Sequence, residues 1–92
     1  MKELKKVMQD LGWKQLRFNG KEVMWQKNLS DRILLEAVFY KSKDSCLVKA
    51  LELVNPENKQ RPIFEEIHKF MSKTFEDAYA EVVDWLTTNK KI

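Results

Sequence analysis

Hydrophobic residues recur with the period of a helix at the start of the chain. The apolar residues of this segment are spaced i, i+3, i+4 and i+7, and they are Leu4, Val7, Met8 and Leu11. This spacing predicts an amphipathic helix of about three turns. Gly12 follows directly, at the position where helices commonly end.

The stretch LRFNGKEVMWQ, residues 16–26, predicts a β-hairpin. Its Asn19-Gly20 dipeptide lies between two alternating segments, which is a strong signal for a two-residue turn. Such a turn places Arg17 opposite Glu22, a favourable cross-strand pair. The apolar face of the predicted hairpin then consists of Leu16, Phe18, Val23 and Trp25.

Residues 32–40 (RILLEAVFY) and 46–54 (CLVKALELV) predict two long strands joined by a KSKDS loop. A five-residue loop sets Ile33 opposite Leu53 and Phe39 opposite Leu47. The reverse face of these strands is also apolar, and it carries Leu34, Val38, Tyr40, Cys46, Val48, Ala50 and Val54. An antiparallel sheet with one solvated face alternates more cleanly. Either helices cover both faces, or a partner covers one of them.

The last third of the chain predicts helix. After the loop NPENKQRP, apolar residues return at helical spacing between Ile63 and Met71, and Thr74 with Asp77 resembles a capping box. Residues 63–88 therefore form one bent helix or two helices with a break near Ser72. The predicted fold is a single α+β domain over residues 1–92: an N-terminal helix, a four-stranded antiparallel β-meander and a C-terminal helical region.

Charge and composition narrow the class of protein. The net charge of the 92 residues is +3, and residues 1–32 carry eight Lys/Arg against four Asp/Glu. One cysteine, Cys46, excludes an intramolecular disulfide framework and favours a reducing cytoplasm. No apolar segment has the length of a membrane span or the form of a signal peptide, so we expect no membrane partner.

Catalytic chemistry has few candidate residues here. His68 is the single histidine, and both glycines already have structural roles, as helix stop and as hairpin turn. Glu65 and His68 have the i, i+3 spacing found in carboxylate-bridged metal sites, but those sites need a second such motif and the sequence has none. A Gly-rich phosphate loop is also absent from the sequence. We therefore expect a non-enzymatic protein with no catalytic residues, no metal and no cofactor.

Two binding hypotheses remain. Protein binding, self-association included, would use the second apolar sheet face, with the candidate residues Leu34, Val38, Tyr40, Val48 and Val54. Nucleic-acid binding is the alternative, through basic residues of the first third with Trp13 and Trp25 nearby for stacking: Lys5, Lys6, Lys14, Arg17, Lys21 and Lys27. In size and lysine content the chain resembles small phage and mobile-element proteins that block a host protein, although no motif carries that resemblance.

Overall fold

The computed structural model describes residues 2–18 and 20–92, except for the side chains of residues 2–4, 17 and 18. Two helices enclose five strands in the chain order α1, β1 to β5, α2. The bounds of these elements are α1 Lys2–Asp10, β1 Lys14–Phe18, β2 Glu22–Asn28, β3 Ile33–Tyr40, β4 Ser45–Leu53, β5 Phe64–Ser72 and α2 Phe75–Thr88. The predicted α+β class with an antiparallel sheet and a C-terminal helix is confirmed.

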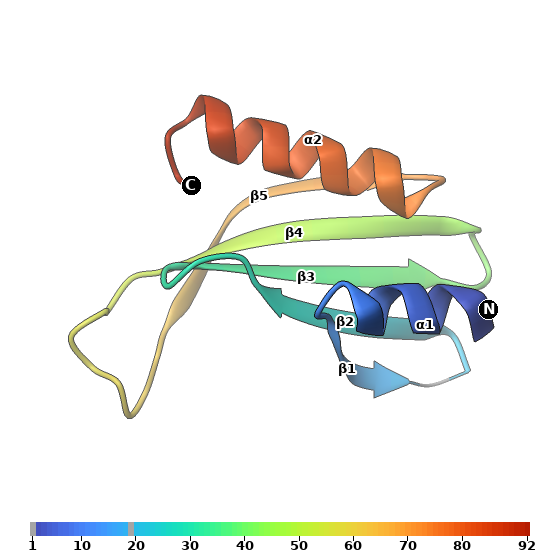
Figure 1. Ribbon diagram of the computed structural model, residues 1–92, viewed down its shortest axis with the longest axis horizontal. Coiled ribbons are helices and arrows are strands. Elements are labelled where there is room, and N and C mark those ends of the chain that lie inside the picture. Colours follow the sequence, from blue (N-terminus) through green and yellow to red (C-terminus); the bar gives the residue numbers. More distant parts are fainter. Residues whose placement is uncertain (1, 19) are drawn as a thin grey trace.

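The strands form one antiparallel meander in the spatial order β1-β2-β3-β4-β5. Figure 1 shows α1 lying across β2 and α2 running along β5 and β4. Both helices contribute to a single core, because Met8 of α1 and four buried residues of α2 belong to the same apolar cluster. The helices therefore share one face of the sheet. The other face, which neither helix covers, is called the open face below.

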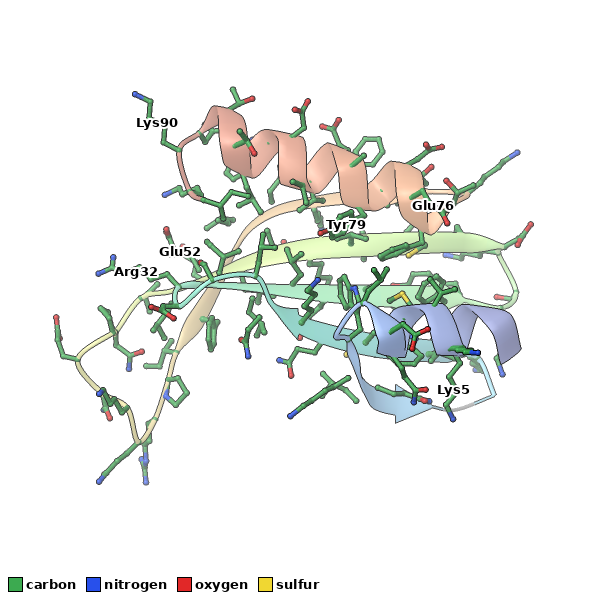
Figure 2. The ribbon with its side chains drawn as sticks, in the orientation of Figure 1. Lys5, Arg32, Glu52, Glu76, Tyr79 and Lys90 are labelled. Carbon is green, nitrogen blue, oxygen red and sulfur yellow. The ribbon has the colours of Figure 1, made fainter. Side chains whose placement is uncertain are left out.

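The core lies between the helices and the alternating inward residues of β2, β3 and β4. Leu35, Val48 and Leu86 are fully buried at its centre. At one end Trp13 contacts two rings of α2, at centroid distances of 5.6 Å to Phe75 and 6.2 Å to Tyr79. Figure 2 shows Tyr79 between α2 and the sheet. Edge-to-face ring contacts of this kind add to the stability that area burial supplies.

The C-terminal helix starts where its capping signal predicts. The hydroxyl Oγ1 of Thr74 accepts a hydrogen bond from the backbone N–H of Asp77 at 3.2 Å, and Thr74 itself has extended backbone angles. This is the geometry of an N-cap residue. Glu76 and Asp77 lie in the first turn, where negative charge interacts favourably with the helix dipole.

The prediction of helix between residues 63 and 72 is wrong, because Phe64–Ser72 forms the fifth strand. Its backbone pairs with the whole outer side of β4, which a helix there would leave unpaired. Ile67 is an extra residue at a bulge between the pairs Ala50–His68 and Leu51–Glu66, and it packs against the core. The bulge shifts the alternation of inward and outward side chains along β5 by one residue. The apolar residues of this segment therefore have a spacing that resembles that of a helix. Figure 1 shows the resulting bend in β5.

The predicted register between the two long strands is wrong by one residue. Phe39 pairs with Cys46 and Leu35 pairs with Ala50. The connection is a four-residue turn over residues 41–44, and Asp44 closes it with a φ of 48°. Asp tolerates this left-handed conformation better than most residues. Because side chains alternate along a strand, the shorter turn moves every side chain of β4 to the opposite face from the one expected.

The first hairpin has the predicted strands but a different register. Phe18 pairs with Val23 and Arg17 pairs with Met24, so the predicted register, with Arg17 directly opposite Glu22, is not the observed one. Asn19, on which the turn prediction depends, lies outside the described residues. The register shifts again between Gln15 and Arg17, and Leu16 at this irregularity is 48% exposed rather than part of the core. Bulges are common at sheet edges, where β1 lies.

Candidate functional site

The open face of the sheet is the most unusual surface of this protein. Its apolar residues come from β2, β3, β4 and β5 and are Met24, Leu34, Val38, Tyr40, Leu47, Leu51, Leu53, Phe64 and Met71. None of them belongs to the core cluster beneath the helices. Most are only partly buried, and Met71 is 47% exposed. Exposed apolar patches on a protein surface are often interaction sites, so this face is the candidate site.

The register orders the open face into three rows that run across the strands. The Val38 row consists of Met24, Val38, Leu47 and Met71. Next to it, the Glu36 row consists of Gln26, Glu36, Lys49 and Lys69. The Leu34 row follows, with Asn28, Leu34, Leu51 and Glu66. Leu34 and Val38 are only 6% and 2% exposed, so the accessible apolar surface of this face comes mainly from the side chains on the strands beside β3.

A charged row thus divides two apolar rows. Lys49 Nζ lies 3.8 Å from Glu66 Oε1, and Lys69 Nζ lies 4.0 Å from Glu66 Oε2. Glu36 lies directly opposite Lys49 in the β3–β4 ladder. These partly exposed groups are worth little to the stability of the chain itself. They do place a negative charge on β3, at Glu36, beside positive charges on β4 and β5, at Lys49 and Lys69.

The candidate protein-binding residues are only partly brought together. Leu34, Val38 and Tyr40 share the open face. Val48 is fully buried beneath the helices, so it is unavailable to a partner. Val54 follows the end of β4 and is 48% exposed, with its N–H donating to the carbonyl of Ile63 at 2.9 Å.

Sequence reasoning missed half of the open face. It assigned Leu47, Leu51 and Leu53 to the core, and the one-residue register shift moves them outward. It also assigned Phe64 and Met71 to a helix. Asp44 was the available signal, because an Asp at the end of a polar connection favours a tight turn. With that turn, the pairing of Glu36 with Lys49 and of Leu34 with Leu51 follows directly.

The candidate nucleic-acid residues are not gathered on one surface. Lys5 and Lys6 are exposed on α1, and Figure 2 shows Lys5 at the end of the molecule opposite Arg32 and Glu52. Lys14 shares the open-face side with Gln26, whereas Lys27 lies on the helix side, where its Cε approaches Gly12. Lys21 already interacts with another group of the protein. The side chain of Arg17 lies outside the described part of the chain.

The two tryptophans of that hypothesis are core residues. Trp13 and Trp25 are each 3% exposed. An indole stacks on a nucleic-acid base only when its ring is accessible. Neither tryptophan is therefore available as a stacking platform beside the basic residues.

Cys46 has the environment of an unreactive thiol. It is 1% exposed beneath the first turn of α2. Burial raises the pKa of Cys46 to about 12, and the negative charge of Glu76 adds to the increase. Because the thiolate is the nucleophilic form, this position is suited to packing.

The ring of His68 stacks on the side chain of Trp85. The centroids of the two rings are 4.5 Å apart, and the interplanar angle is 2°. Nε2 lies 3.9 Å from Glu81 Oε1, which is too far for a hydrogen bond. Across the side chains that the structure describes, no group of three or more His, Cys, Asp or Glu residues has a metal-binding arrangement.

These observations define a two-layer α+β protein in which a five-stranded meander carries both helices on one face and a patterned apolar surface on the other. Neither helix, over the residues described, has the length and apolar character needed to cross a membrane. No protein-family model matches the chain, and no curated protein and no solved structure matches it.

Proposed function

We propose that this protein is a non-enzymatic binding protein of the cytoplasm that acts by docking the open face of its sheet onto another protein molecule. The observation that carries the proposal is the apolar character of a sheet face that neither helix covers. Burial of such a surface is the main favourable term in protein association. The charged row that crosses it adds specificity and orientation rather than bulk affinity.

Other features support binding rather than catalysis. The one thiol is buried with a raised pKa, and the one imidazole is stacked on Trp85. A cytoplasmic setting agrees with a single unpaired cysteine. The open face is therefore the best candidate for the binding surface of this protein.

Site-specific photo-crosslinking in the native cells tests this proposal. Benzoylphenylalanine replaces Leu51 on the open face in one variant and Leu11 in a matched control. Leu11 is an apolar residue of the helix layer that is 51% exposed. We expect protein adducts from position 51 but not from position 11, and we expect Leu47→Lys to abolish them while the far-UV circular dichroism is unchanged. Equal adduct formation at the two positions, or none at position 51, would refute the proposal.

A further inference from the structure

The rows of the open face make it complementary to itself. We propose that its partner is a second copy of this chain, related by a two-fold axis that lies in the interface, runs parallel to the strands and passes between β3 and β4. This inference rests on the proposed function, because it names the partner of the same surface. Closed two-fold symmetry is the commonest arrangement of homo-oligomers.

The axis determines which residues meet. A two-fold axis parallel to the strands places β3 of one copy over β4 of the other. It leaves the position of each row along the strands unchanged, so each row faces the same row of the partner. Glu36 then faces the partner's Lys49, and Lys49 faces the partner's Glu36. In the same way Val38 faces the partner's Leu47, and Leu34 faces the partner's Leu51, so apolar residues of the two central strands face apolar residues.

The charges disfavour a two-fold axis that runs across the strands along the Glu36 row. A two-fold perpendicular to the strands through the Glu36 row would stack Glu36 on the partner's Glu36 and Lys49 on the partner's Lys49. Like charges in an interface cost several kcal/mol. The alternation of Glu36 and Lys49 therefore selects the axis parallel to the strands. It also fixes the register, which is the best-attested use of polar groups within an apolar interface.

The dimensions of the face suit a face-to-face sheet dimer. Four strands spaced about 4.8 Å apart and four residue steps of about 6.8 Å along them cover roughly 500–600 Å² per protomer. Two such faces cover about 1,100 Å² in total, which is close to the lower limit of roughly 1,000 Å² for a specific interface and corresponds to a weak, reversible dimer. Twisted sheets cross at about 30°, so the closest contacts lie near the centre of the face, at Glu36, Leu47 and Lys49, which are partly exposed.

Charge reversal with sedimentation velocity tests the arrangement. Glu36→Lys places two lysines against each other at both symmetry-related contacts, and Lys49→Glu places two glutamates there. Each variant is expected to weaken dimerisation by about tenfold or more. Mixing the two variants restores both opposite-charge contacts, so a heterodimer should form from two proteins that do not dimerise alone. Glu57→Lys and Lys59→Glu are the matched controls, because they make the same charge changes in the exposed β4–β5 loop and should dimerise like the wild type.

Three results would overturn the inference: a wild-type chain that is monomeric at every concentration, single variants that dimerise as well as their controls, or a mixture that does not recover. The crosslinking experiment separates this failure from that of the proposed function. A monomeric chain that still forms adducts through position 51 binds a different protein with the open face. A monomeric chain without such adducts refutes both proposals.

Discussion

Adjacent residues of β4 give a direct test of which face of the sheet is buried. The structure places Val48 beneath the helices with no exposed surface. Its neighbour Leu47 lies on the open face and is only partly buried. Truncating each residue to alanine should therefore give unequal losses of stability, and the smaller residue should show the larger loss.

The magnitudes follow from burial. Val48→Ala removes both γ-methyl groups from the core, which loses roughly 1.6 kcal/mol of transfer free energy at about 0.8 kcal/mol per group. The cavity that remains raises the cost to about 2–3 kcal/mol. For a domain of this size the melting temperature should fall by roughly 10–20 °C. Leu47→Ala removes more atoms, but water already reaches them, so we expect a loss of about 1 kcal/mol or less.

Thermal and guanidinium unfolding, followed by tryptophan fluorescence, measures both losses. Trp13 and Trp25 are buried in the core, so their emission reports global unfolding. The measurements belong at the lowest usable protein concentration, where association through the open face does not add to the stability of Leu47. If Leu47→Ala were as destabilising as Val48→Ala, the register of β3 with β4, and with it the open face, would be incorrect.

Three further predictions concern single residues. Folding raises the pKa of Cys46 from 9.0 to about 12, so the folded state favours the protonated thiol. The contribution of this preference to stability is complete below about pH 9 and is lost as the pH rises towards 12. Cys46→Ala should therefore reduce the loss of stability at alkaline pH, as measured by urea titrations. Thr74→Ala should cost about 1 kcal/mol by removing the N-cap, and Thr74→Ser should restore most of it in the same assay. Asp44→Gly should leave the melting temperature unchanged or raised, whereas Asp44→Val should lower it through strain at the φ of 48°.

The parts of the fold that sequence could predict depend on local signals. The first helix, the strand character of residues 32–54 and the cap at Thr74 are each encoded within a few neighbouring residues. β5 could not be recognised in this way, because its bulge at Ile67 changes the alternation halfway along the strand. Its assignment depends on pairing with β4, which is a non-local interaction that propensity does not report.

The existence of a second apolar sheet face was predicted from the sequence, but not all of its residues were. A second apolar sheet face is visible in the sequence because β3 lacks clean alternation, and Leu34, Val38 and Tyr40 were located correctly on it. The contribution of β4 depended on one residue of turn length, and the wrong choice exchanged Val48 for Leu47. Because successive side chains of a strand point to opposite faces, a register change of one residue exchanges the residues on the two faces of a sheet. The turn at Asp44 therefore decides the composition of the open face.

The edges of the sheet explain why association should use its open face. β1 and β5 are the edge strands of the described sheet, and free edges invite strand-to-strand pairing with other chains. Here β5 carries Glu65, Glu66 and Lys69, and β1 carries Lys14 and a bulge at Leu16, all of which oppose edge pairing. The central strands, in contrast, carry the apolar rows. Charges that discourage pairing at the edges thus agree with the proposal that another molecule docks on the face, oriented by Glu36 and Lys49.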